Sequence, residues 1–552
     1  MAVLSHRDRA SADVDGSYDV VVIGAGIGGL VASALMAREG LRVLVLEQNP
    51  SPGGCSVSIA RRGWSFSVGI HYVGECGPGE RVRRIVDACG APDFRFLPLS
   101  RDLEDIRLGE DRFGIPATWS DFRSSLVERF PAERAGIERY FSFVEQVDRV
   151  GRAGVERSSL GFALTVLKSP LILKYARSTA GQMIDSCIRD PKLRAILTAR
   201  HFLSGVAPSR ASSLTHGGLE AHYQVSGGWF PEGGAQALSD RLADEIEAAG
   251  SHVRLGAAAR RIEVSGRRVT GVYFESRRLG ERRVKTGHVV SNADVKHTIR
   301  DLVGADLFPR SFAERLLGFE MAQPLFTVFL GLDVPSERIG IGGGNHWLWG
   351  RLDHESEYDD LARGELPEDP TLYMSSDSFK GAGGAGDEPE EGSSLTLISL
   401  APRQPEFWGV TAEEVRDGSY GRNPEYRRIK EEIADAVVER ASALAPGLAD
   451  HVKVREIATP LTVHRYVGVS DGAAYGFANL PDQFVRKRPG ARTPLRGLHF
   501  CGMNCRSGHG VMGAVASAVD VADTLAGRGL RRRILAGRVP VSRRGAPDLP
   551  SA

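Results

Sequence analysis

The chain has little net charge and little cysteine for its length. Among 552 residues, Lys and Arg total 70 and Asp and Glu total 69, which leaves a formal net charge of +1. Balanced charge gives no general attraction for a polyanion, so nucleic-acid binding is not expected. The six cysteines are scattered and form no CxxC pair. We therefore expect a reduced, cytoplasmic protein without a metal site.

The patterns of common hydrolases and zinc enzymes are also missing. The 14 histidines form neither an HxH nor an HExxH spacing, and the sequence contains no GxSxG motif. A zinc hydrolase and a serine hydrolase of the nucleophile-elbow type are therefore not expected.

Long apolar runs are scarce. The most apolar stretch outside the predicted strands is 160–176, and Lys168, Pro170 and Lys174 interrupt it. It is shorter than the roughly 20 apolar residues that a spanning helix requires, so we expect no membrane span. Two alternatives stay open, an interfacial helix that makes peripheral membrane contact and a core helix kinked by proline.

Glycine is abundant, with 65 residues that gather in short clusters. The first cluster follows an apolar, valine-rich run at 18–24, and a helical pattern then extends to Gly40 before a second apolar run at 41–49. This order predicts a strand, a helix and a parallel strand. Gly24, Gly26 and Gly29 match the fingerprint of a dinucleotide-binding turn, in which the helix N-terminus stabilises a pyrophosphate.

Further residues indicate which dinucleotide binds. Glu47 ends the second strand, where its carboxylate would accept hydrogen bonds from ribose hydroxyls and repel a 2′-phosphate. Gly53 and Gly54 would let bare backbone run beside a cofactor. A distant C-terminal loop offers a second glycine-rich helix start, with Gly502, Gly510, Val511, Met512 and Gly513 as cofactor contacts. A long flavin dinucleotide needs two such sites, so we expect FAD.

The nucleotide-type segments are discontinuous, which predicts an α/β protein with a doubly wound, Rossmann-type FAD-binding unit and a second, mixed α/β substrate unit. We expect 17–100, 206–305 and 490–527 in the FAD-binding unit, 101–205 and 306–489 in the substrate unit, and flexible tails at 1–16 and 528–552.

Several motifs together resemble the phytoene desaturase superfamily, and most closely its carotenoid isomerase and retinol saturase branch. These are the glycine fingerprint with Glu47, SFSVGIHYVG (65–74), GGWFPEGGAQAL (227–238), VVSNAD (289–294), ATPLTVHRYVGVSDGAAYGF (458–477) and GLHFCGMNCRSGHGVMGA (497–514). The resemblance covers about 18–527. It implies bound FAD, a fold like that of the amine oxidases, and a tunnel that admits a long polyene.

Candidates for the reacting site come from the same motifs. His71 and Tyr72 could supply or accept the proton that accompanies hydride transfer, or they could simply pack around the cofactor. Arg465, Tyr466 and Tyr475 lie where the resemblance implies substrate contacts, and a structural role is the alternative for each.

The expected activity is hydride chemistry at carbon–carbon double bonds of a hydrophobic polyene, as saturation, isomerisation or desaturation. Electrons would come from NAD(P)H, a redox partner or oxygen, or from no net source in an isomerisation. Alternatives are an enzyme that reduces and cyclises a polyketide polyene, as in tetramate macrolactam pathways, a flavin amine oxidase, and a non-catalytic lipid escort resembling the GDP-dissociation inhibitors. The sequence does not indicate the oligomeric state.

Overall fold

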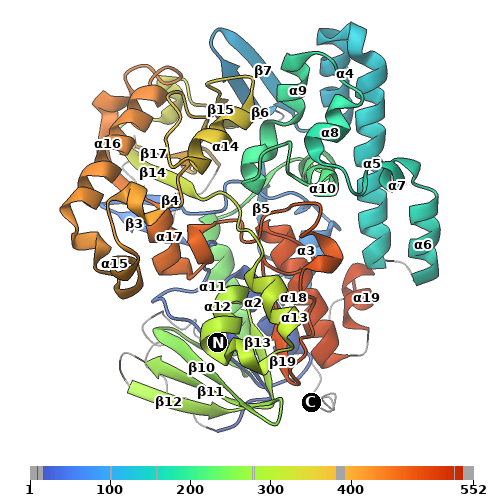
Figure 1. Cartoon of the computed structure of the whole chain (residues 1–552), viewed down its shortest axis with the longest axis vertical. Coiled ribbons are helices and arrows are strands. Elements are labelled where there is room, and N and C mark those ends of the chain that lie inside the picture. The colour runs from blue at the N-terminus through green and yellow to red at the C-terminus, as the bar shows by residue number, and fades with distance from the viewer. Residues whose placement is uncertain are drawn as a thin grey trace.

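The predicted nucleotide-type strands form one parallel sheet in a computed structural model that describes residues 6, 9, 16–99, 102–156, 159–276, 278, 280–380, 392–527 and 529–538. Figure 1 shows this sheet in the lower part of the molecule. Its order is β19 (Leu498–Phe500), β13 (His288–Ser291), β1 (Val20–Ile23), β2 (Val43–Leu46) and β9 (His252–Arg254). All neighbouring strands are parallel. Because consecutive strands come from distant segments, the unit is discontinuous, as expected.

Both faces of this sheet are buried. Val20 and Val22 pack on the side of three helices, α2 (Ile27–Arg38), α11 (Gly234–Ala248) and α18 (Gly510–Ala526). Val21 and Ile23 pack on the opposite side, against an antiparallel sheet of β10 (Ala257–Ser265), β11 (Arg268–Ser276) and β12 (Gly280–Lys285). Burial on both faces explains why the strands are continuously apolar. The predicted fold class is confirmed, and a β-sheet covers the second face.

A seven-stranded mixed sheet forms the second unit. Its order is β18 (Val452–Ala458), β14 (Leu325–Leu332), β17 (Ser393–Leu400), β16 (Leu372–Ser375), β15 (Asn345–Leu348), β6 (Asp102–Leu108) and β7 (Asp111–Pro116). Helix α16 (Pro424–Ala441) packs on one face. The other face contacts a helical cluster that includes α5 (Arg134–Glu156) and α10 (Ser213–Gln224). Every strand of this sheet falls in a range expected for the substrate unit.

Helix α10 differs from the expectation. Its residues fall in the range 206–305 that we assigned to the FAD-binding unit, yet the helix packs on α5, where Gly217 lies against Phe143 and Val147. Its burial with the helical cluster explains this placement, because Ala221 belongs to the same apolar core as Phe143.

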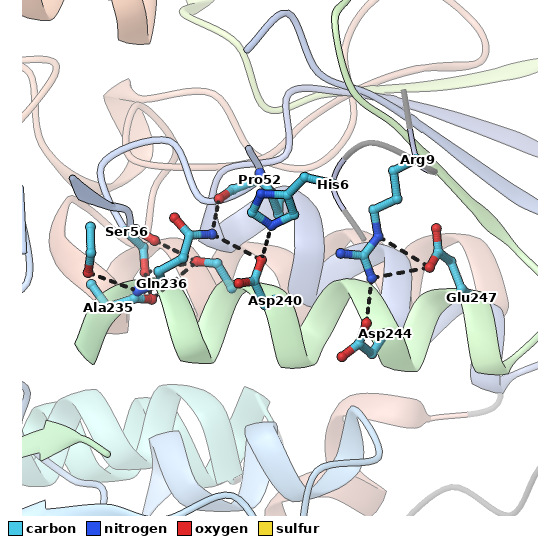
Figure 2. Close-up of polar contacts among 11 residues, drawn as sticks. His6, Arg9, Pro52, Ser56, Ala235, Gln236, Asp240, Asp244 and Glu247 are labelled. Atoms are coloured by element: carbon cyan, nitrogen blue, oxygen red, sulfur yellow. Dashed lines mark hydrogen bonds and ion pairs between the residues drawn. The ribbon is translucent and has the colours of Figure 1, made fainter. Parts of the chain in front are cut away.

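Two residues of the predicted N-terminal tail, His6 and Arg9, are described, and both contact α11. Arg9 is buried and pairs with Asp244 and Glu247 of α11, and His6 Nε2 lies 2.7 Å from Asp240 Oδ1 (Figure 2). The acidic face of α11 therefore holds these two side chains by charge. The remaining residues of 1–15 lie outside the described residues.

The C-terminal segment is also partly ordered. Helix α19 (Leu530–Leu535) buries Leu530 and Ile534 against the helices beside the parallel sheet. The arginines around these two apolar positions obscured the helical spacing in the sequence. Residues 528 and 539–552 of the predicted tail lie outside the described part of the chain. No helix within the described ranges is both long and apolar enough to cross a bilayer.

Candidate cofactor and substrate site

Three loops meet where β1, β13 and β19 end. The Asn292 backbone N–H donates to the Ile23 carbonyl at 2.8 Å, and its side-chain Nδ2 donates to the Gly24 carbonyl at 3.3 Å. Gly502 lies on the other side of the same side chain, so close that an added Cβ would come 2.6 Å from Asn292 Oδ1. Ligands bind at this edge of parallel sheets because the loops there diverge. Asn292 therefore joins the two glycine motifs, which are far apart in the sequence.

The first glycine motif forms a tight turn into α2. A Cβ on Gly29 would lie 2.1 Å from the Gly24 carbonyl oxygen, so only glycine permits the observed contact between helix and strand. The Gly53 N–H donates to the Ala25 carbonyl at 2.7 Å and fixes the second glycine pair beside the turn. The Gln236 side chain on α11 donates to the carbonyl of Pro52, the residue before Gly53, at 3.0 Å (Figure 2). This bond fixes the loop that carries Gly53 and Gly54.

Glu47 is buried at the end of β2. Its Oε2 accepts from the Ala25 N–H at 2.8 Å, and its Oε1 accepts from the N–H and Nδ2 of Asn49, each at 2.9 Å. Burial raises the pKa of this carboxyl group despite these donors. A carboxylate has about four acceptor positions, so room remains for a ribose hydroxyl.

A cavity of about 820 Å³ connects these elements. Its lining includes the predicted cofactor residues Gly24, Gly26, Glu47, Gly53, Gly54, Gly502, Gly510 and Val511. The volume lies in the upper part of the range for small-molecule sites, as a long dinucleotide requires. The residues present therefore fit FAD, with bare backbone at the turns, a helix N-terminus and a buried acceptor.

The other predicted cofactor residues support the site indirectly. Gly29, Met512 and Gly513 are not among the residues that line the cavity. A Cβ on Gly513 would lie 2.3 Å from the Gly508 carbonyl oxygen, so this glycine allows the C-terminal loop to pack against α18. Met512 packs on the core of the parallel sheet.

Replacement of Glu47 by glutamine should weaken FAD binding roughly 10- to 100-fold, because a buried charged acceptor with several donors is lost. Titration of the apoprotein with FAD, followed by flavin fluorescence, measures the change. Glu439→Gln is the control, since Glu439 is exposed on α16. Equal affinity in both variants would remove Glu47 from the cofactor site.

Two of the three predicted substrate residues lie near Asn49 and Glu47. The Tyr466 carbonyl accepts from Asn49 Nδ2 at 2.8 Å, and Arg465 lies beside the Tyr466 ring. Both residues line the cavity next to the Glu47 wall, so the structure places them by the predicted ribose position. Helix α17 (Pro460–Val467) brings them there.

Tyr475 lies closer to the second glycine motif. It lines the cavity, and its ring lies 5.2 Å from that of His509, the residue before α18. His509 Nε2 lies 3.0 Å from the Leu203 carbonyl oxygen. Tyr475 therefore stays a candidate for substrate contact, at a junction between the two units.

His71 has an unusual environment. Among the described residues, neither ring nitrogen has a hydrogen-bond partner, and the ring lies 5.6 Å from that of Tyr373. Burial, together with the Lys380 charge, lowers the pKa of His71 to about 3. Lys380 donates to the His71 carbonyl at 2.7 Å, and burial lowers the pKa of this lysine to about 8. At neutral pH His71 is uncharged, with one free N–H donor and one free acceptor.

Tyr72 belongs to a buried polar network. Its hydroxyl donates to Glu104 Oε1 at 2.6 Å, and its ring lies 4.2 Å from that of Tyr223. The Arg200 guanidinium forms ion pairs with both Glu104, at 2.8 Å, and Glu220, at 2.5 Å. Neither Tyr72 nor His71 is among the residues that line the cavity. For Tyr72, this geometry favours the packing alternative over proton transfer.

The same network predicts a dependence of stability on pH. Burial raises the pKa of Glu220 from 4.5 to about 7, although Arg200 opposes the shift. The native state thus holds the proton more tightly than the unfolded state does, so the free energy of unfolding falls as pH rises from about 4.5 to about 7. Glu220→Gln should remove this part of the slope. Urea unfolding of both proteins at several pH values measures the difference, and parallel curves would contradict the assignment.

Comparison with known proteins identifies the family. Residues 27–526 match the family described as flavin containing amine oxidoreductase. The chain belongs to this family. As a member, it is a flavin-dependent oxidoreductase, and the predicted family resemblance is confirmed.

Within the amine oxidoreductase family, this chain is similar to several individual proteins. An all-trans-retinol 13,14-reductase from Danio rerio is 26% identical over 539 residues, which cover 93% of this chain and 86% of the relative. A chloroplastic prolycopene isomerase from an Oncidium hybrid cultivar is 25% identical and covers 92% of this chain and 84% of the relative. The structure of an oxidoreductase from Methanosarcina mazei matches with a TM-score of 0.60 at 16% identity and covers 91% and 99% of the two chains. The structural match shows the fold.

The sequence did not single out Asn292 of the site, nor Lys380, which contacts His71 outside the cavity lining. Asn292 directly follows β13, so the rule that strand ends gather at one edge could have indicated it. Lys380 gave no such signal, because its contacts with Asn345 and Ser375 depend on how β15 and β16 pack.

Proposed function

We propose that this protein uses FAD to perform hydride chemistry at a carbon–carbon double bond of a hydrophobic polyene. The main support is similarity along nearly the whole chain to two kinds of protein whose names specify a polyene, a retinol reductase and a prolycopene isomerase. Both relatives are matched through the substrate unit as well as the FAD-binding unit, since more than nine-tenths of this chain is covered.

The chain's own residues would hold the cofactor as follows. The turn at Gly24 and Gly26, with the N-terminus of α2, would accept the pyrophosphate, and Glu47 would accept from a ribose hydroxyl. Gly502, Gly510 and Val511 would contact the cofactor from the side of α18. Bound FAD supplies a site that gives or takes a hydride.

We regard His71 as a packing residue behind the cavity wall rather than a proton donor, because both ring nitrogens are buried and the residue does not line the cavity. With a pKa of about 3, it is far from the value that suits a general acid or base near neutral pH. NAD(P)H is the electron donor we propose if the net reaction is a reduction.

A comparison of substrates tests the proposal. The purified protein, loaded with FAD and reduced anaerobically with NADPH or dithionite, is mixed with all-trans-retinol or with a cis-configured carotene, and the products are separated by chromatography, which resolves double-bond isomers, and analysed by mass spectrometry. A gain of two hydrogens, from one hydride and one proton, or a change in double-bond geometry supports the proposal. Flavin reduction by putrescine, with both polyenes unchanged, would instead make the protein an amine oxidase.

A further inference from the structure

Two short helices at the edge of the molecule expose an unusual amount of apolar surface. They are α6 (Ser159–Leu167) and α7 (Pro170–Tyr175), at the right-hand edge of Figure 1 beyond α5. The exposed fractions are 71% for Leu160, 48% for Leu164, 68% for Leu167 and 56% for Leu173. The structure shows ten exposed large apolar side chains among its described residues, and these four fall within 14 positions. Clustering of this kind marks an interaction surface, whereas single exposed leucines do not.

Three of the exposed leucines lie on one side of α6, and Leu173 lies on α7, which contacts α6. Leu160, Leu164 and Leu167 have the spacing of one side of a helix. The opposite side of α6 packs inward, where Thr165 is buried and Phe162 lies against Gly154 of α5. Helix α6 therefore has packed contacts on one side and an apolar face toward solvent on the other. We refer to Leu160, Leu164, Leu167 and Leu173 as the leucine face.

The charged residues within the segment that carries the leucine face are all positive. Residues 159–177 contain no Asp or Glu, and Lys168, Lys174 and Arg177 are exposed. None of these three basic side chains forms an ion pair among the described residues. Helix α19 lies nearby, because Arg531 Nη2 donates to the carbonyl of the same Gly154 at 3.0 Å. Arg532 and Arg538 of this C-terminal segment are exposed as well.

We propose that α6 and α7 dock this protein on a lipid bilayer with anionic headgroups, the leucine face entering the interface. An apolar helical face with a basic border is the pattern of an interfacial anchor. A protein partner of matched shape would be expected to meet acidic as well as basic residues at the border, and this border has none in 159–177. The proposal does not depend on the reaction that the enzyme performs.

Vesicle binding tests the docking surface. The full-length, FAD-loaded protein is sedimented with vesicles of phosphatidylcholine and phosphatidylglycerol in equal parts. Replacement of all four leucines of the face by serine should weaken binding at least about a hundredfold, since four buried side chains lose their transfer from water. The matched control replaces Leu307, Leu352 and Leu366 by serine. These side chains are exposed elsewhere, so the control should bind like the wild type.

A second variant tests the charges. Replacement of Lys168, Lys174 and Arg177 by alanine should weaken binding to the mixed vesicles by about fivefold per charge. Added salt should reduce the difference between this variant and the wild type. Flavin content and the thermal unfolding midpoint, measured for every variant, separate a loss of docking from a loss of folding.

Three outcomes would overturn the proposal. The wild type could fail to bind the mixed vesicles, or the control could lose binding as strongly as the leucine-face variant. In the third outcome, the wild type is a dimer that does not bind vesicles, and the variant with all four leucines replaced is a monomer. In that case the leucine face would join two copies of the chain.

Discussion

Protein with valine in place of Gly29 should purify without flavin absorbance. An added Cβ would lie 2.1 Å from the Gly24 carbonyl oxygen, so either α2 or the turn must move. Either movement displaces the helix N-terminus that would hold the pyrophosphate. Loss of the cofactor also removes its stabilisation, about 2.7 kcal/mol at a free FAD concentration 100 times the Kd. Absorbance spectra and thermal unfolding with and without added FAD measure both effects.

Gly151→Ala provides the matched control for Gly29→Val. Gly151 lies within α5, and an added Cβ there has no atom within 4 Å. Alanine should therefore keep the flavin and stabilise the helix by up to about 1 kcal/mol. Full flavin content in Gly29→Val would contradict the close approach of helix and strand.

Replacement of Arg200 by alanine should destabilise the protein by about 3–5 kcal/mol. Arg200 is fully buried and is the cation between Glu104 and Glu220, which are buried as well. Its removal leaves two carboxyl groups without their counter-charge in a medium that solvates charge poorly. Urea unfolding, with flavin release followed separately, measures the loss.

The exposed ion pair of Arg210 and Glu320 provides a control for the Arg200 replacement. Arg210 pairs with Glu320 at 2.7 Å, and both side chains are exposed. Arg210→Ala should therefore cost no more than about 1 kcal/mol. If both replacements had the same effect, the buried network would not contribute to stability as we infer. Additional replacement of Glu104 and Glu220 by glutamine should recover part of the stability of Arg200→Ala, because fewer buried charges remain.

The parallel sheet could be predicted from the sequence because local patterns specify it. A valine-rich run that ends at glycine identifies β1, a second apolar run identifies β2, and the glycine spacing identifies the turn between β1 and α2. Glu47 follows from the same unit, since its distance from the turn is set by one helix and one strand. These features depend on neighbours in sequence, and the structure agrees with them.

The substrate unit was harder to predict, since its contacts join distant segments. Tyr72 lies in a loop and contacts Glu104 of β6 and Tyr223 of α10, and no local sequence pattern links the three residues. Tyr466 followed the family resemblance to a substrate position, yet the fold of α17 places it near Asn49. The contacts of Arg9 with Asp244 and Glu247 likewise join residues far apart in the sequence.

The position of β19 has a consequence for biosynthesis. This strand begins at Leu498 and pairs with β13, which in turn pairs with the strand that begins at Val20. A ribosome must therefore release nearly the entire polypeptide before the sheet gains its last member and the loop at Gly502 reaches Asn292. Until then the nascent chain has exposed strand edges, which favour aggregation. Chaperone demand during translation should accordingly be high, and truncation before Leu498 should yield insoluble protein.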